Sequence, residues 1–363
     1  MSRKHKFYFS FHHWCGLFVG LFMLSMSITG ALLVFSDEMT EHINSPYMQV
    51  SNTDGKFSVD ASFKQLQKQY PGWELRIYDW PKKDEALVYE MRKKDERKRV
   101  FIDPVKGTVL HVLEDANATL PRKLILLHYT LFAGATGKVI IMIVGLLFAA
   151  TLISGVLLYR KSIVKVLSFK IKIHGQTKRA FFSSLHRVVG VWTLLFNIVI
   201  VTTGLTLSIN IVRNLAKGGS TKMAVKEAKA PPIPSVDTVI ARATAEYPDF
   251  KINNIRIPAK GDIIFLAGRT NGDPQWYGEF YSNVQYDAQT LKVVKSQWMK
   301  KAGFTDRWPV MSSALHFGNY GGIPVKILYC FFGFMPAILS ISGFVIWRYR
   351  INAKKKNALK KSI

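Results

Sequence analysis

Four long apolar segments divide the chain, and each is long enough to cross a lipid bilayer. They span residues 14–36, 139–159, 188–211 and 327–347, and none of them contains a charged residue. A membrane-spanning helix needs about 20 predominantly apolar residues. Because four such stretches are hard to accommodate in one soluble core, the pattern predicts four transmembrane helices.

The two long polar segments between these helices resemble each other. Residues 58–73 and 235–250 each show a short helical pattern that ends at a turn containing proline. Runs of alternating apolar and polar residues follow, separated by polar turns, and this pattern is typical of β-strands. Asp103 and Asp287 occupy the same place in the last of these turns. Each polar segment is therefore predicted to form a small α+β module.

The motifs around the apolar segments recur in the same order. SFHHWCG at Ser10 aligns with SLHRVVG at Ser184, and LHYTLFAGATGK at Leu127 aligns with LHFGNYGGIPVK at Leu315. Four dipeptides align as well, Thr29-Gly30 with Thr203-Gly204 and Ser154-Gly155 with Ser342-Gly343. A repeat that includes both helices and polar segments indicates a tandem duplication.

The distribution of charge predicts the orientation in the membrane. The chain has 50 Lys and Arg residues against 24 Asp and Glu, a formal net charge of +26. Such an excess first suggests nucleic acid, but residues 1–10, 160–187 and 348–363 lack acidic residues altogether and flank the apolar segments. Positive charge marks the cytoplasmic side of membrane proteins. We therefore expect no nucleic-acid partner, contact with membrane lipid, cytoplasmic termini, and large loops in the periplasm of a bacterial inner membrane.

Together these patterns predict a membrane α-helical fold class, a four-helix transmembrane bundle from a tandem repeat with two periplasmic α+β modules. The first apolar segment is expected to remain as an anchor, because no small-x-small cleavage site precedes Asp37. The predicted parts are transmembrane helix 1 with the cytoplasmic N-terminus (1–36), module 1 (37–121), transmembrane helix 2 (122–160), a basic cytoplasmic loop (161–185), transmembrane helix 3 (186–212), module 2 (213–315), transmembrane helix 4 (316–348) and a basic cytoplasmic tail (349–363).

Several cofactor classes lack their sequence motifs. The two cysteines, Cys15 and Cys330, form no CxxC or CxxCH, which argues against zinc ribbons, thioredoxin-like chemistry and covalent haem attachment. Neither GxGxxG after a strand nor GxxxxGK[ST] occurs, so a nucleotide-binding domain is unsupported. An electron donor, if one is used, has to come from elsewhere.

Four of the nine histidines occupy repeat-equivalent positions at helix ends. His12 pairs with His186 at the cytoplasmic side, and His128 pairs with His316 at the outer side. Helix bundles build cofactor sites from inward side chains on facing helices, and two axial histidines saturate a haem iron for electron transfer. The geometry thus allows two facing histidine pairs, and haem iron is one centre that such pairs ligate. His13 adjoins His12, and only the repeat alignment favours His12.

Small and basic residues near these histidines extend the hypothesis. Glycines that leave room for a macrocycle are expected beside both pairs, namely Gly16, Gly20, Gly190, Gly134, Gly137, Gly321 and Gly322. Three basic residues are candidates for binding haem propionates: Lys138, Lys326 and Arg187. The alternatives are plain helix packing for the glycines and snorkelling toward the interface for the lysines.

These residues make the chain similar to the PepSY-associated transmembrane family. The matching elements are HHWCGLFVG, FIDPVKGTVL, LHYTLFAGATGK and LHFGNYGG, in that order. The family includes iron-regulated inner-membrane proteins and ferric-siderophore reductases of the ferrioxamine type. The resemblance implies two haem b groups, ligated by His12, His128, His186 and His316, and two periplasmic PepSY modules. The sequence departs from the pattern at Val188, where the first half has Trp14.

The resulting hypothesis is a di-haem inner-membrane electron-transfer protein that reduces a periplasmic ferric siderophore. Its electrons are expected from a cytoplasmic or quinone-pool electron donor, and the sequence assigns no catalytic residue. The alternatives are a non-enzymatic, membrane-anchored PepSY binding module, copper or another metal at the histidine pairs, and an iron or siderophore importer. An importer needs polar or broken mid-membrane helices, for which the candidates are Asn197, Thr202, Thr203 and Pro336.

Overall fold

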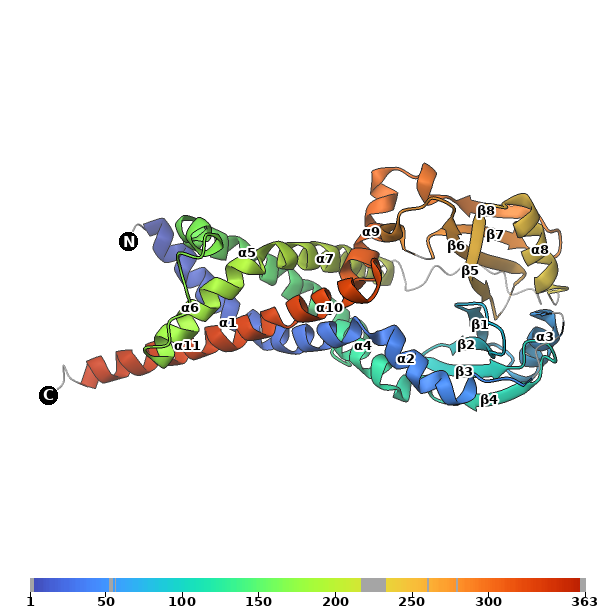
Figure 1. Ribbon diagram of the computed structural model, residues 1–363, viewed down its shortest axis with the longest axis horizontal. Coiled ribbons are helices and arrows are strands. Elements are labelled where there is room, and N and C mark those ends of the chain that lie inside the picture. Colours follow the sequence, from blue (N-terminus) through green and yellow to red (C-terminus); the bar gives the residue numbers. More distant parts are fainter. Residues whose placement is uncertain are drawn as a thin grey trace. The chain divides into compact units, whose positions relative to one another are not determined.

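The computed structural model describes residues 3–51, 55, 57–216, 233–259, 261–278 and 280–359 (Figure 1). The chain forms two compact units. The helical unit combines Met1–Phe35, Leu124–Gly218 and Leu315–Ile363, and the sheet unit combines Ser36–Lys123 and Gly219–Ala314.

Long apolar helices make up the helical unit. They are α1 (Arg3–Leu33), α5 (Gly134–Leu167), α6 (Lys178–Trp192), α7 (Leu194–Ala216), α10 (Gly322–Gly333) and α11 (Met335–Leu359). Within the described residues, four spans are long and apolar enough to cross a membrane, which confirms the predicted number. Large apolar side chains such as Leu21 (73% exposed) and Leu195 (75% exposed) lie on the outer surface of these helices, as expected of a surface that contacts lipid.

The packing places α1 at the centre of the bundle. It contacts α5 on one side and α10 and α11 on another, while α5 packs on α7 and α6 packs on α11. Small residues allow these close approaches: the Cα of Ala31 in α1 lies 3.3 Å from the position that a Cβ on Gly333 would take. Such small-residue contacts are typical of membrane helices.

The helices are interrupted where the sequence predicts continuous segments. The predicted helix 122–160 is split into α4 (Leu120–Thr130) and α5 by a turn in which Leu131, Phe132 and Gly134 have positive φ. The predicted basic loop 161–185 contains the end of α5 and the start of α6. The boundary between α10 and α11 falls just before Pro336, which lacks the N–H that a continuous helix uses.

A hydroxyl group from α1 forms hydrogen bonds to backbone groups on both sides of the break between α10 and α11. Ser27 Oγ donates to the Gly333 carbonyl at 2.5 Å and accepts from the Ala337 amide at 3.0 Å. Both backbone groups lie in the apolar span and gain a partner from this one side chain. The bond therefore joins the first and last membrane helices at the break.

The sheet unit contains one antiparallel sheet in the order β4-β3-β2-β1-β5-β6-β7-β8. Its strands are β1 (Glu74–Ile77), β2 (Leu87–Lys93), β3 (Glu96–Ile102), β4 (Val109–Leu113), β5 (Phe250–Ile257), β6 (Ile263–Thr270), β7 (Ser282–Asp287) and β8 (Val293–Gln297). The remaining helices are α2 (Ser36–Asn44), α3 (Asp60–Gln69), α8 (Val236–Glu246) and α9 (Phe304–Phe317), with 3-10 turns at Ser45–Tyr47, Ala116–Ala118, Gln275–Tyr277 and Met299–Lys301.

The two predicted modules are halves of this one sheet rather than separate bodies. β1 and β5 pair antiparallel at the centre, with Leu75 opposite Ile257 and Ile77 opposite Ile255. Both strands would otherwise be exposed edges, and pairing them satisfies the backbone groups of each. The helices α3 and α8 pack on one face, where their apolar side chains and those of the strands share a single core. The other face carries a smaller buried cluster of Val50, Ala86 and Phe101, together with polar and charged side chains.

Two aspartates hold α3 and α8 together in a reciprocal way. The carboxylate of Asp60 in α3 accepts from the Ser235 hydroxyl at 2.5 Å and from the Val236 amide at 2.7 Å. Asp237 in α8 accepts from the Ser58 hydroxyl at 2.5 Å and from the Val59 amide at 2.9 Å. Each helix thus receives, at its first turn, a negative charge that its unpaired amides and its dipole favour.

Candidate functional site

The structure brings the four repeat-equivalent histidines together in two pairs. The rings of His12 in α1 and His186 in α6 lie 6.3 Å apart between centroids, with their planes at 84°. The rings of His128 in α4 and His316 in α9 are also 6.3 Å apart, with their planes at 56°. Every one of these residues belongs to the helical unit.

In the first pair, each ring is held by the neighbouring membrane helix. His12 Nδ1 lies 3.1 Å from the Thr151 carbonyl and 3.1 Å from the Ser154 hydroxyl, both on α5. His186 Nδ1 lies 3.1 Å from the Leu339 carbonyl and 2.9 Å from the Ser342 hydroxyl, both on α11. A carbonyl accepts only from a protonated nitrogen, so these contacts assign the proton to Nδ1.

In the second pair, the Nδ1 of each ring contacts a threonine hydroxyl, where the first pair has a serine hydroxyl. His128 Nδ1 lies 3.0 Å from Thr29 Oγ1 on α1, and the Met26 carbonyl is its backbone partner. His316 Nδ1 lies 3.1 Å from Thr203 Oγ1 on α7, and the Ile200 carbonyl is its backbone partner. All four rings therefore meet a carbonyl and, three residues later on the same helix, a hydroxyl. This leaves Nε2 of each ring as the nitrogen with a lone pair.

The glycine after each hydroxyl residue makes room for the ring. A Cβ on Gly30 or on Gly204 would lie 2.9 Å from Cε1 of His128 or of His316. The corresponding distances are 3.2 Å from Gly155 to His12 and 3.5 Å from Gly343 to His186. Sequence reasoning aligned these dipeptides without giving them a role. The signal that identifies them is a hydroxyl residue followed by glycine, found four times at repeat-equivalent positions.

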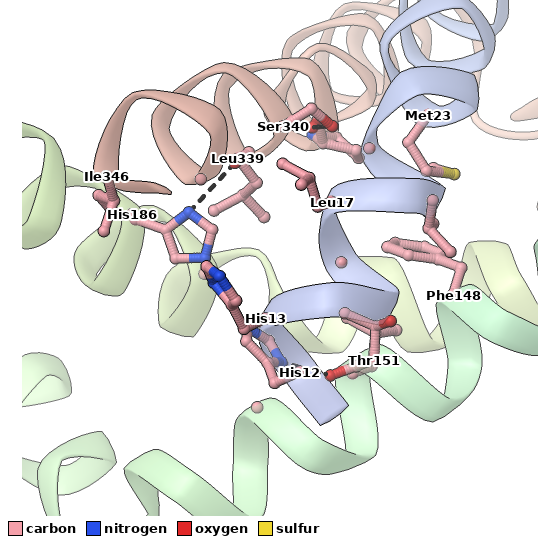
Figure 2. Close-up of a pocket in the computed structure, with 18 of the residues that line it drawn as sticks. His12, His13, Leu17, Met23, Phe148, Thr151, His186, Leu339, Ser340 and Ile346 are labelled. Carbon is pink, nitrogen blue, oxygen red and sulfur yellow. Dashed lines mark hydrogen bonds between the residues drawn. The ribbon is translucent and has the colours of Figure 1, made fainter. Parts of the chain in front are cut away.

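A cavity of about 570 Å³ surrounds the first pair (Figure 2). His12 and His186 line it together with apolar side chains and with Gly16, Gly20 and Gly190, the glycines predicted for this site. Figure 2 also shows the bond from His186 to Leu339 on the wall. A cavity of this size is within the range of small-molecule and cofactor sites.

His13 and Arg187 line the same cavity in different ways. The His13 ring stacks on Phe9 at 6.0 Å, and the ring that pairs with His186 is that of His12. Arg187 adjoins His186, and its Nε is buried without a hydrogen-bond partner among the described residues. A buried guanidinium nitrogen of this kind favours an anionic group in the cavity.

Residues predicted beside the outer pair have other roles or no assigned one. Gly134, Gly321 and Gly322 have positive φ and form the turns that start α5 and α10, and Gly137 packs directly on the backbone of Thr130. Their expected place beside a macrocycle stays a prediction. The Lys138 ammonium lies 5.7 Å from the Tyr129 ring centre, next to His128 in sequence. Lys326 lies on α10, and a propionate role for either lysine stays a prediction.

The spacing of the pairs fits an iron held between two imidazoles. A metal bonds an imidazole nitrogen at about 2 Å and the ring centre lies roughly 1.2 Å further, so two facing ligands have centres about 6 Å apart. Both pairs measure 6.3 Å. The described residues contain no group of three or more His, Cys, Asp or Glu that could hold a metal ion. Two protein ligands are what a haem needs, because its macrocycle supplies the remaining four nitrogens.

Comparison with known proteins adds the family. No curated protein matches the chain. The family model of the PepSY-associated TM region matches residues 9–350, which includes all four paired histidines, their hydroxyl partners and the whole sheet unit. The chain therefore belongs to the family of PepSY-associated transmembrane proteins.

Proposed function

We propose that this membrane protein holds two haem b groups, one between His12 and His186 and one between His128 and His316, and passes electrons to a periplasmic ferric siderophore. The observation that carries the proposal is the shared geometry of the two pairs. Each has centroids 6.3 Å apart, with every Nδ1 bonded to a neighbouring helix. When bound, haem b would supply a one-electron carrier at each pair.

The chain's own residues supply positioning at each site. The carbonyl and hydroxyl partners fix the tautomer and orientation of each imidazole and raise its basicity toward a metal. The glycine after each hydroxyl lets the ring approach its supporting helix. In the first cavity, the Arg187 guanidinium would pair with a propionate.

The two sites lie at different depths of the membrane. His12 and Thr29, the residue that holds His128, are 17 positions apart on α1, which is about 25 Å along a helix axis. This approaches the thickness of a bilayer's hydrocarbon core, which is about 30 Å. With the basic segments in the cytoplasm, the first pair would face the cytoplasmic donor and the second the periplasm.

A ferric siderophore is a suitable acceptor for one-electron transfer. Hard oxygen ligands hold ferric iron far more tightly than ferrous iron, so one electron per iron releases the metal and leaves the chelator intact. A quinol donor would lose two electrons and two protons for every two ferric ions reduced.

The residues that favoured an importer have structural partners. Thr203 bonds His316, and the helix boundary at Pro336 is bridged by Ser27 of α1. The Asn197 side-chain amide donates to the Thr193 hydroxyl one turn earlier, and its Oδ1 is buried without a hydrogen-bond partner among the described residues. If the helices only anchored a binding module, they would not require four imidazoles that share one hydrogen-bonding arrangement. Electron transfer accounts for these features best.

Reoxidation of the reduced protein by a ferric chelate tests the proposal. Purified protein is reduced with dithionite, freed of reductant under argon and mixed with a ferric siderophore in the presence of a ferrous-specific dye. We expect haem reoxidation with one ferrous ion trapped per electron, and loss of this reaction in His316→Ala but not in the exposed-helix control His42→Ala. Reoxidation no faster than without chelate contradicts the proposal.

A further inference from the structure

The face of the sheet opposite α3 and α8 carries a group of arginines, and near β3 it is partly covered by Tyr47, Met48 and Val50. Five lie on adjacent strands and are called the arginine face: Arg76, Arg92, Arg97, Arg99 and Arg256. Strand pairing places them on one side, since Arg76 is opposite both Glu90 and Arg256, and Glu90 is opposite Arg99. Arg92 is likewise opposite Arg97.

Carboxylates neutralise only part of this charge. Glu90 accepts from Arg92 at 2.6 Å and from Arg97 at 2.7 Å, and Glu74 accepts from Arg76 at 2.7 Å. The ion pairs of the described residues leave Arg99 and Arg256 without a carboxylate. Arg99 donates to the Asn44 side chain at 3.1 Å, and Arg256 lies 5.2 Å from the Phe265 ring centre. Two carboxylates against five guanidiniums leave an excess positive charge on this face.

The guanidiniums are held together despite their mutual repulsion. Burial, and then the charges of Arg92 and Arg122, lower the pKa of Arg97. Burial, and then the charge of Arg76, lower the pKa of Arg256. Arginine stays protonated at neutral pH all the same, so the face retains its positive charge. An anion bound there would relieve this repulsion.

Aromatic side chains lie beside the guanidiniums. Tyr78 accepts from Arg92 at 2.5 Å and from Arg76 at 3.3 Å, and its ring is 6.0 Å from that of Phe280. Phe280 comes from the connection between β6 and β7 and is 39% exposed. Aromatic rings next to guanidinium groups suit a ligand that is both anionic and partly apolar.

We propose that the arginine face binds a ferric chelate of net negative charge, bearing carboxylate or catecholate groups, as the substrate of the reductase proposed above. The inference rests on that proposed function for the identity of the ligand. Guanidinium forks match carboxylate oxygens two at a time, and a concentrated positive patch attracts anions from solution. Neutral and cationic hydroxamate chelates have no carboxylates for the guanidiniums and are not attracted by positive charge. The arginine face therefore selects against them.

Binding of a redox-inert chelate separates this inference from electron transfer. Gallium(III) has the charge of ferric iron but is not reduced, so gallium citrate is titrated into the full-length protein in nanodiscs by calorimetry. We expect binding that weakens with salt and falls about tenfold in Arg256→Gln and in Arg99→Gln. The control Arg242→Gln removes an arginine from α8, on the covered side of the sheet, and is expected to bind like the wild type.

Three outcomes contradict the proposal. One is equal affinity for gallium citrate and for a cationic gallium hydroxamate. The second is unchanged binding in both arginine variants. The third is absence of gallium citrate binding together with arginine-dependent binding of phosphatidylglycerol vesicles, which would assign the face to lipid headgroups. If gallium citrate binds as expected but ferric citrate is not reduced, the proposed function fails and this inference stands.

Discussion

The four paired imidazoles share one arrangement at the scale of single residues. Each Nδ1 meets a backbone carbonyl and a hydroxyl three residues later on another helix, and the next residue is glycine. The hydroxyls themselves bond carbonyls of their own helices, as Thr29 does to Ser25 at 2.8 Å. Such outer partners orient metal-binding histidines and tune the bound metal.

Removal of one of these hydroxyls is expected to weaken a site without destroying it. In Ser342→Ala, His186 keeps the Leu339 carbonyl but loses the 2.9 Å contact. We predict that haem is released from the first pair about tenfold faster, since second-layer partners of metal ligands contribute on this scale. Transfer to apomyoglobin measures this rate. Thr202→Ala, whose hydroxyl bonds only its own helix, should be unchanged, and equal rates in both variants would refute the role.

An added methyl group at the glycine is expected to be more damaging. Gly30→Ala places Cβ 2.9 Å from Cε1 of His128, so the ring has to move. We predict loss of about half the bound haem, measured as pyridine haemochrome per chain. Gly145→Ala is the matched control, because its Cβ would meet only the flexible end of Leu205, also at 2.9 Å. Full haem content in Gly30→Ala would contradict this role of the glycine.

The paired histidines could be predicted from the sequence, whereas the residues that hydrogen-bond to them could not. A repeat alignment singles out His12 over His13, because it needs only equivalent positions. The contact of Ser154 with His12 joins residues 142 apart, and no local pattern reports it. The positive φ of Gly134, Gly321 and Gly322, which places them in turns, was likewise not predicted.

At the scale of elements, the two equivalent β-turns depend on aspartate. Asp103 Oδ1 accepts from the amides of Val105 at 3.0 Å and Lys106 at 2.9 Å. Asp287 Oδ1 accepts from the amides of Gln289 at 3.0 Å and Thr290 at 2.8 Å. The bond from the Thr290 amide, followed by weaker contributions, lowers the pKa of the Asp287 carboxyl. The turn between β7 and β8 is therefore stabilised by the ionised form.

This stabilisation is expected to depend on pH. Because the folded pKa of Asp287 is below the unfolded value of about 3.9, the contribution is complete above that value and lost as the pH falls through the folded pKa. Amide exchange at Gln289 and Thr290 should therefore be slower in the wild type than in Asp287→Asn at pH 6. The difference should disappear toward pH 2. A difference that persists unchanged at pH 2 would contradict the role of the charge.

The bond that bridges α10 and α11 gives a second prediction for the elements. Ser27→Ala removes one hydrogen-bond partner from the Gly333 carbonyl and one from the Ala337 amide inside the apolar span, and the amide keeps its 3.1 Å bond to the Phe334 carbonyl. An intramolecular hydrogen bond contributes about 1 kcal/mol to stability, so the denaturation midpoint of the helical unit should fall. Thr202→Ala, whose hydroxyl bonds only its own helix, is the control. Equal midpoints in both variants would show that the bridge is not needed.

Apolar length predicted the membrane helices, and alternation predicted the strands of the sheet. The pairing of β1 with β5 was not predicted, because it joins residues far apart in the chain. The turn at Leu131 and Phe132 was also missed. Both residues have positive φ, which is uncommon for residues with a side chain, and nothing in their composition signals a break.

At the scale of the whole molecule, most of the charge of +26 lies in three segments without acidic residues, which flank the membrane helices and predict topology. The arginine face is a local feature, because four of its five arginines lie in residues 37–121, where acidic residues offset the basic ones. Neither requires nucleic acid.

The predicted topology can be tested with reporters. Alkaline phosphatase is active only outside the cytoplasm, so a fusion at Gly175, between α5 and α6, should be inactive. A fusion at Gly272, in the turn after β6, should be active. The reverse pattern would place the sheet unit in the cytoplasm and contradict a periplasmic acceptor.

The haem content of the protein and of its four histidine variants tests the central claim most directly. A reduced-minus-oxidised spectrum of protein expressed with added haem should show two b-type haems per chain. His12→Ala and His186→Ala should each lose one of them, and His128→Ala and His316→Ala should each lose the other. Protein without a Soret band, or variants whose spectra equal that of the wild type, would contradict the account.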